Sequence, residues 1–362
     1  MIAQVAAPHA PVLDPSVLPS TTSDRMDVMS GPTSPRPSVL VFATGGTIGM
    51  RSTDGGLAPD PDFPEVLESM VARICVPLGI ASRVNHLSPA IDSANADAET
   101  APRIARAVRA RVRTQKPRGV VITHGTDTLA YTAARLAFEL GDLGVPVVVT
   151  GSQLPHGAAD TDAADNLSLA IRASVKAAPG SPVSIAFGGE LLPAVRATKH
   201  DSVSLTAFRA ERPLAKGAAG IPAFLEDLEP PSASARVIAF RFTPGVAAAD
   251  ITAAVGGGPD ALVLECYGSG NGPTARPGML GALREACGRI PVVAVTQCAN
   301  GTVDLGRYAV GRELAAAGVI DGSDLTVEAA TSKLGFLLDR GHRGAELRRF
   351  MERNLVGECA GA

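Results

Sequence analysis

The chain has 362 residues, of which 46% are hydrophobic and 19% are charged, and its formal net charge at pH 7 is −3. This composition is typical of a globular protein that is long enough for two domains. The near-neutral charge excludes a strongly basic surface for nucleic acid or anionic membranes, and no stretch approaches the ~18 apolar residues of a membrane-spanning helix.

The first 37 residues differ from the rest of the chain. Residues 1–37 are rich in proline, serine and threonine and show no hydrophobic period. Such a segment cannot bury enough apolar surface to offset its ordering entropy, so we expect a disordered tail. It also lacks a basic region followed by an apolar run, which argues against a signal peptide.

From residue 38 the sequence alternates between strand-like and helix-like segments. Buried strands are predicted at 38–42, 119–124, 146–150 and 183–187, where β-branched residues form short runs. Helices are predicted between them, with apolar residues every four positions in 101–115, 127–140 and 165–175. This alternation predicts a largely parallel sheet covered by helices on both faces.

A second α/β unit is predicted after a proline-rich break. Residues 213–235 show no clear period and read as a linker. Strands follow at 237–242, 261–266 and 291–296, with the last helices at 326–338 and 344–355. We therefore expect a larger N-terminal α/β domain at 38–212, which is catalytic, and a C-terminal α/β domain at 236–362.

The five cysteines indicate the redox setting. They are scattered, odd in number and contain no CxxC pair: Cys75, Cys266, Cys287, Cys298 and Cys359. This pattern favours reduced thiols in the cytoplasm over a disulfide framework or a metal site.

Polar loops follow the predicted strands of the first domain. They contain Thr44 to Thr47, Asp92-Ser93, His124 to Thr128, and Thr150 to Gln153. Ligands of open parallel sheets collect at the carboxyl ends of strands, so these loops predict a site. Helix-capping threonines would explain any one loop, but explain four less well.

The glycine turn in VFATGGTIGM, at residues 41–50, has two possible interpretations. A dinucleotide fingerprint needs G-x-G-x-x-G, but the first glycine position here is Thr44, and no GK[ST] of a P-loop follows. The alternative is a turn that presents a hydroxyl nucleophile, which needs a general base. His124 lies in a candidate loop, and Lys199 could serve if Asp127 fixed its position. A surface salt bridge is the plainer explanation for that pair.

The motifs ATGGTIG at 43–49 and THGTDT at 123–128 resemble the two signatures of the bacterial-type L-asparaginases. The resemblance continues through TGSQLP at 150–155, CYGSGNGP at 266–273, TQCANG at 296–301 and AGVIDGSDLTVEAATSKL at 317–334. The TGSQ, YGSGN and TQC forms of these motifs are most similar to those of the type I, cytoplasmic branch of that family.

The resemblance implies a role for particular residues. Thr47 matches the nucleophile, and Thr126, Asp127 and Lys199 match a Thr-Lys-Asp relay. The residues that match substrate contacts are Asp92, Ser93, Gly125, Thr126, Asp127, Ser152 and Asn271, the last reaching into a neighbouring subunit's site.

The implied activity is hydrolysis of L-asparagine to L-aspartate and ammonia through an acyl-enzyme, with possible weak glutaminase activity. The resemblance implies no cofactor and no metal, and a homodimer or homotetramer with sites near subunit interfaces. We expect neither a nucleic-acid nor a membrane partner.

One departure from the family's pattern concerns the loop after the glycine turn. Leu57 stands about where many members have a tyrosine, so we expect the nucleophile to be activated differently or more weakly. Two alternatives remain open: a non-catalytic amino-acid-binding or regulatory homologue, and the amidase subunit of a tRNA-dependent amidotransferase. The latter would need an additional N-terminal domain and a basic RNA-binding surface.

Overall fold

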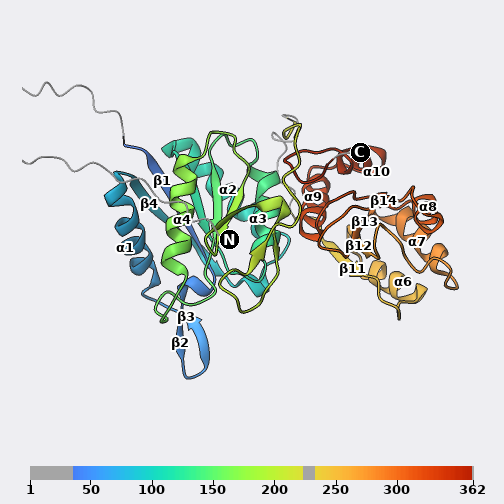
Figure 1. Cartoon of the computed structure of the whole chain (residues 1–362), viewed down its shortest axis with the longest axis horizontal. Helices are drawn as coiled ribbons and strands as arrows, with labels where there is room; N and C mark the ends of the chain where they lie inside the picture. The colour runs from blue at the N-terminus through green and yellow to red at the C-terminus, as the bar shows by residue number, and fades with distance from the viewer. Residues whose placement is uncertain (1–35, 223–232, 361–362) are drawn as a thin grey trace, which may run out of the picture. The chain divides into compact units, whose positions relative to one another are not determined.

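Six strands form the sheet of the N-terminal domain (Figure 1). The structure, a computed structural model, describes residues 36–222 and 233–360. In spatial order the strands are β4 (Ala81–Ile91), β1 (Ser38–Gly45), β5 (Gly119–Thr123), β6 (Val147–Thr150), β7 (Ser184–Phe187) and β8 (Glu190–Pro193). All neighbours pair in parallel except β7 and β8, which are antiparallel.

Helices cover both faces of this sheet, which explains the nearly continuous apolar runs in its central strands. Leu40 and Phe42 of β1 belong to the core that packs against α2 and α3, whereas Val39 and Val41 belong to the core of the other face. The helices are α2 (Thr100–Gln115) and α3 (Leu129–Leu140) on the first face, and α1 (Phe63–Cys75) and α4 (Ala163–Lys176) on the second.

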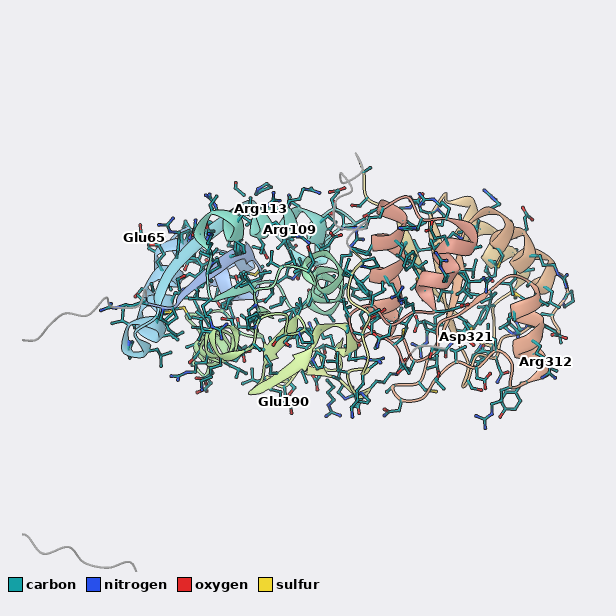
Figure 2. All side chains as sticks on the ribbon, turned by 90° about the horizontal axis from the view of Figure 1, so that it is seen from above. Glu65, Arg109, Arg113, Glu190, Arg312 and Asp321 are labelled. Atoms are coloured by element: carbon teal, nitrogen blue, oxygen red, sulfur yellow. The ribbon has the colours of Figure 1, made fainter. Side chains whose placement is uncertain are left out.

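Helix α2 has a buried apolar face toward the sheet and arginines on its other faces. Its apolar positions Ile104, Val108 and Val112 are buried, as their spacing predicts. Its arginines lie on the other faces, where Arg113 is exposed and Arg109 pairs with Asp142 (Figure 2).

A four-stranded parallel sheet forms the smaller C-terminal domain. Its strands are β11 (Val237–Arg241), β12 (Ala261–Cys266), β13 (Val292–Thr296) and β14 (Ile320–Asp321). One face packs on α6 (Ala248–Gly256), α7 (Met279–Arg289) and α8 (Ala309–Ala316), and the other on α9 (Val327–Asp339). α10 (Gly344–Met351) follows α9 in the chain.

Helices α3 and α9 join the two domains through a buried ion network. Arg135 of α3 pairs with Glu139 one turn along and with Asp339 of α9. Arg340 pairs with Glu139 at 3.0 Å. Burial opposes charge on Glu139, but Arg135 and Arg340 outweigh it and hold the pKa of Glu139 below its usual value.

The α/β alternation, the parallel sheets and the two-domain fold are confirmed. The prediction for the last helix was too long, because α10 ends at Met351 rather than residue 355. Beyond it Gly357 has φ +94, and Glu358 accepts hydrogen bonds from the backbone N–H groups of Leu355 and Val356. These contacts form a tight turn at residues 355–358, where the prediction had continued the helix. The expected tail lies outside the described residues, apart from Arg36 and Pro37, as do residues 223–232 of the expected linker.

Several β elements were not predicted, including β8, β14, β4 and a hairpin. β4 is the edge strand of its sheet, and only Ile91 at its end is buried. The polar loop after the glycine turn forms an antiparallel hairpin of β2 (Met50–Thr53) and β3 (Gly56–Pro59), which extends from the sheet layers (Figure 1).

Candidate active site

The polar loops of the N-terminal domain meet at the carboxyl ends of its strands. A Cβ atom on Gly46 would lie 2.4 Å from the Cα of Gly125, and one on Gly125 would lie 2.3 Å from Oγ of Ser93. Thr128 donates a hydrogen bond to the carbonyl oxygen of Ser93 at 2.8 Å. The loops after β1, β4 and β5 are therefore in direct contact, and glycine permits their close approach.

The two threonines of the glycine turn lie in different environments. Thr44 is fully buried, and its hydroxyl donates to the carbonyl oxygen of Thr123 at 2.7 Å. Thr47 begins the 3₁₀ turn η1 (Thr47–Gly49) and is partly exposed. The first hydroxyl therefore holds β1 to β5, while the second lies where a ligand can reach it.

Lys199 links the second signature to the last loop of the domain. It lies in β9 (Thr198–Lys199), which pairs with β10 (Phe208–Arg209). Its Nζ donates to Oγ1 of Thr126 at 3.0 Å and to Oδ1 of Asp127 at 2.8 Å. Thr126 is buried, whereas the Asp127 side chain is 63% exposed, so this carboxylate also faces solvent or a ligand.

Asp92 and Ser93 follow β4 at the same edge of the sheet. Asp92 is exposed and caps the 3₁₀ turn η3 (Ser93–Asn95), where its carboxylate accepts from the Ala94 N–H and the Asn95 amide. Ser93 is buried against Gly125. The cap fixes the direction of the Asp92 side chain.

His124 does not reach the site as a general base. Its ring is buried, with Nδ1 2.8 Å from the carbonyl oxygen of Gly125 and Nε2 3.2 Å from Oγ1 of Thr132. Burial lowers the pKa of His124, and the hydrogen bond to Gly125 opposes this only in part. The neutral ring therefore donates from Nδ1 and accepts at Nε2, and both nitrogens are engaged within the protein.

The loop after β6 is held mainly by one carboxylate. Asp162 accepts hydrogen bonds from the backbone N–H groups of Gln153 and Leu154. Ser152 is buried, and its hydroxyl donates to the carbonyl oxygen of Leu154 at 2.5 Å. Ser152 therefore bonds within its own loop.

One buried carboxyl group beside the site was not predicted from the sequence. Glu328 of α9 accepts a hydrogen bond from Oγ1 of Thr198 at 2.6 Å, next to Lys199. Burial raises the pKa of Glu328, and the hydrogen bond from Thr198 only partly counteracts it. Its only sequence signal is its place in the matched segment DLTVEAATSKL.

Asn271 and Leu57 lie apart from this cluster. Asn271 pairs its backbone with Tyr267 in the C-terminal domain. Leu57 lies opposite Ser52 in the β2–β3 hairpin and is 51% exposed. Within the described residues, then, the structure brings together Thr126, Asp127 and Lys199 with the loops of Thr47, Ser93 and Gly125, but not Asn271.

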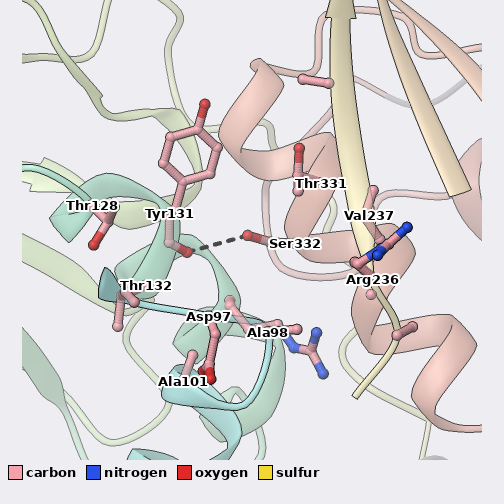
Figure 3. A pocket seen from close by; sticks show the side chains of 15 residues that line it. Asp97, Ala98, Ala101, Thr128, Tyr131, Thr132, Arg236, Val237, Thr331 and Ser332 are labelled. Atoms are coloured by element: carbon pink, nitrogen blue, oxygen red, sulfur yellow. Dashed lines mark hydrogen bonds between the residues drawn. The ribbon is translucent and has the colours of Figure 1, made fainter. Parts of the chain in front are cut away.

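A pocket of about 430 Å³ lies beside these loops, between α3 and the C-terminal segments β11 and α9 (Figure 3). Thr128, which contacts the Ser93 loop, is one of its lining residues. The Ser332 hydroxyl donates to the carbonyl oxygen of Tyr131 at 3.3 Å across it. The ring of Tyr131 points away from this bond, and burial, with Glu328 and Glu265 nearby, raises the pKa of Tyr131 to about 12.

The described residues contain no group of three or more His, Cys, Asp or Glu side chains arranged to hold a metal ion. None of the helices in that part of the chain is long and apolar enough to cross a membrane.

The fold and the site define a two-domain α/β protein with a threonine–lysine–aspartate cluster at the edge of its first sheet. The family model described as Asparaginase, N-terminal matches residues 38–224, and Glutaminase/Asparaginase C-terminal domain matches residues 236–351. The chain belongs to the asparaginase family, so the resemblance seen in the sequence is confirmed.

Named relatives agree with this assignment. The chain is 34% identical to an L-asparaginase of Thermococcus kodakarensis, covering 90% of this chain and 99% of that protein. It is 35% identical to L-asparaginase 1 of Escherichia coli K12, covering 89% and 97%. The crystal structure of L-asparaginase I from Vibrio cholerae superimposes with a TM-score of 0.74 at 31% identity, covering 90% and 99%.

Proposed function

We propose that this protein hydrolyses L-asparagine to L-aspartate and ammonia. The observation that carries the proposal is the position of Lys199 Nζ, 3.0 Å from the Thr126 hydroxyl and 2.8 Å from the Asp127 carboxylate. A lysine held by a carboxylate can accept a proton through a neighbouring hydroxyl when it is in its neutral form. The names of the relatives, which are L-asparaginases, support the substrate.

The proposed reaction begins with Thr47. Its hydroxyl oxygen attacks the carbon of the side-chain amide while its proton leaves toward the Thr126–Lys199 pair. The carbon–nitrogen bond breaks, the nitrogen takes up a proton, and ammonia leaves. Water then hydrolyses the resulting ester, which releases aspartate and restores the Thr47 hydroxyl. No step requires a cofactor or a metal.

The remaining site residues suit an amino-acid substrate. The carboxylates of Asp92 and Asp127 offer acceptors for its ammonium group. Ser93 and the backbone around Gly125 offer donors for its carboxylate, and Ser152 would join them if its hydroxyl turned away from the Leu154 carbonyl oxygen. A glutamine side chain is longer by one methylene, which is worth only ~1–3 kcal/mol in a pocket, so weak glutaminase activity is expected beside the main one.

We also propose that the active form is a homodimer or homotetramer in the cytosol. A second copy would bring Asn271 to the site, which would account for its distance from the other site residues within one chain. The cysteines are scattered, odd in number and without a CxxC pair, which supports a reducing compartment.

The test is ammonia release from L-asparagine and L-glutamine by the wild type, Thr47→Ala and Lys199→Ala. We expect release mainly from asparagine, and a loss in kcat of at least about a hundredfold in both variants. Thr114→Ala, a change at an exposed threonine of α2, serves as the control and should be fully active.

The possible outcomes separate the hypotheses. Tight binding of asparagine without ammonia release would favour a binding or regulatory protein. Release from asparagine that persists in Thr47→Ala would reject the proposed nucleophile.

A further inference from the structure

His156 connects the glycine turn to the base of the β2–β3 hairpin. It comes from the loop after β6, and its side chain is 13% exposed. Nδ1 lies 3.1 Å from the carbonyl oxygen of Ile48, and Nε2 lies 3.4 Å from Oδ2 of Asp60. Ile48 directly follows Thr47, so one of these contacts is made to the turn that carries the proposed nucleophile.

The two contacts engage both nitrogens of the His156 ring. A carbonyl oxygen only accepts, so Nδ1 must carry hydrogen to bond Ile48. Nε2 faces the carboxylate of Asp60, so the ring is held at both ends.

Asp60 is itself held in place. Its backbone N–H donates to the carbonyl oxygen of Gly49 at 2.9 Å, and its Oδ1 accepts from the Asp62 N–H at 3.1 Å. These bonds close the base of the hairpin and begin the approach to α1. The Asp60 side chain is 12% exposed, so its contact with His156 is largely shielded from solvent.

The groups packed around His156 leave Asp60 as its charged partner. The ring of Phe63, from α1, lies 5.4 Å from the His156 ring and covers it. Arg51 of β2 lies 3.9 Å from Oδ1 of Asp60, on the other oxygen of the carboxylate. Arg51 is 53% exposed, so water screens its competition with His156 for Asp60.

We propose that His156 is a positioning residue that, through its contacts with Ile48 and Asp60, clamps the Thr47 turn to the base of the hairpin. The role rests on the proposed function, because it concerns the nucleophile of that reaction. His156 does not touch the substrate. It fixes the Ile48 peptide, and through it the direction of the Thr47 hydroxyl.

The first test compares kcat for asparagine hydrolysis in the wild type, His156→Ala and His156→Gln. Alanine removes both contacts, whereas glutamine keeps a donor for the Ile48 carbonyl oxygen. We expect kcat to fall by about fivefold in His156→Ala and to be partly restored in His156→Gln. KM should change by less than about twofold, since the clamp acts on the nucleophile.

Two further variants sharpen this test. Asp60→Ala removes the partner at the other end of the clamp and should lower kcat by a similar factor. His86→Ala, at an exposed histidine of β4, is the matched control and should retain the wild-type kcat. A wild-type kcat in His156→Ala would overturn the proposal.

The second test does not depend on turnover. Hydrogen–deuterium exchange reports the opening of the turn, because the Gly49 N–H donates to the carbonyl oxygen of Gly46 at 3.0 Å and the Asp60 N–H donates to that of Gly49 at 2.9 Å. We expect both amides to exchange faster in His156→Ala than in the wild type. Unchanged exchange in His156→Ala rejects the clamp even if asparagine is hydrolysed. Failure of the wild type to release ammonia rejects the proposed function whatever the exchange shows.

Discussion

Thr44 and Thr47 lie in the same turn but are expected to respond differently to substitution. Thr44→Val removes the hydroxyl that donates to Thr123 and leaves a buried carbonyl without this partner. We expect a loss of about 1–3 kcal/mol in the free energy of unfolding, with kcat retained within a few fold. Denaturant unfolding and ammonia release measure the two effects. A large loss of kcat at unchanged stability would indicate that Thr44, rather than Thr47, is the nucleophile.

The contribution of Glu328 to the free energy of unfolding should change with pH in the direction opposite to that of an ion-paired carboxylate. Because burial raises its pKa in the folded state, the unfolded chain releases this proton more readily. Stability is therefore lost as pH rises from about 4.5, the ordinary value, through the folded pKa. Glu328→Gln keeps an acceptor for Thr198 and removes this loss.

The measurement for Glu328 is unfolding free energy against pH. Glu328→Gln should gain stability relative to the wild type near neutral pH and match it at low pH. Equal curves at every pH would mean that the carboxyl group costs nothing when ionised. Glu328→Leu, which cannot accept from Thr198, should lower stability at every pH.

At the scale of single residues, the sequence motifs predicted the main polar cluster of the site but not the residues that contact and hold it. Lys199, Thr126 and Asp127 came from matched motifs, and the structure brings them together. Their functional roles remain proposals. His156 and Glu328 were missed because their partners lie 108 and 130 residues away in the sequence. A lone histidine in a loop or a glutamate in a helix gives no sign of such a partner.

The β2–β3 hairpin carries Leu57 at about the position where the family resemblance implies a tyrosine. Leu57 is exposed, so Leu57→Tyr should change stability by no more than ~0.5 kcal/mol. If a tyrosine hydroxyl on this hairpin assists the nucleophile, as the family resemblance implies, the variant should raise kcat/KM. Leu57→Phe is the control, because it adds the ring without the hydroxyl. Equal gains from both changes would assign the effect to apolar contact.

The α3–α9 ion network predicts an acid-sensitive contact between the domains. The pKa of Glu139 is lowered in the folded state, so its stabilisation is present above about 4.5, the ordinary value, and lost as pH falls through the folded pKa. Glu139→Gln should therefore weaken the dependence of unfolding free energy on pH below this value. A slope identical to that of the wild type would contradict this assignment.

At the scale of elements, the hydrophobic pattern predicted the strands that are buried on both faces of the sheet, but it did not predict the exposed strands at the edge of the sheet and in the hairpin. The central strands and α2 to α4 were predicted within about two residues, because their apolar periods reflect burial. β4 and the hairpin were missed because their residues are mostly exposed, so solvent rather than a core sets their composition. Backbone pairing with a neighbour defines them, and that leaves little pattern in the sequence.

The end of the described chain is tied into the molecule by a buried ion pair. Nζ of Lys333 lies 2.6 Å from Oε1 of Glu358, both side chains are fully buried, and the same Nζ donates to the carbonyl oxygen of Met351. Lys333→Met would leave the carboxylate buried without its partner. We expect a loss of about 3–5 kcal/mol in the free energy of unfolding.

A double variant separates charge from packing in this pair. Lys333→Met with Glu358→Leu removes both charges and should recover part of the stability lost by Lys333→Met alone. Thermal and denaturant unfolding of the single and double variants give the comparison. No recovery would show that the hydrogen bonds of Glu358 to Leu355 and Val356, rather than the ion pair, hold this segment.

The contact between the glycine turn and its neighbouring loops has a consequence for laboratory evolution. At Gly46 and Gly125 an added methyl group would meet atoms within 2.4 Å, whereas a methyl group added to Gly157 would have no atoms beyond its chain neighbours within 4 Å. A saturation-mutagenesis library should therefore return almost no active clones at the first two positions and many at the third. Selection for a new substrate would have to work through the surrounding side chains, because the backbone at the centre of the site leaves no room for variation.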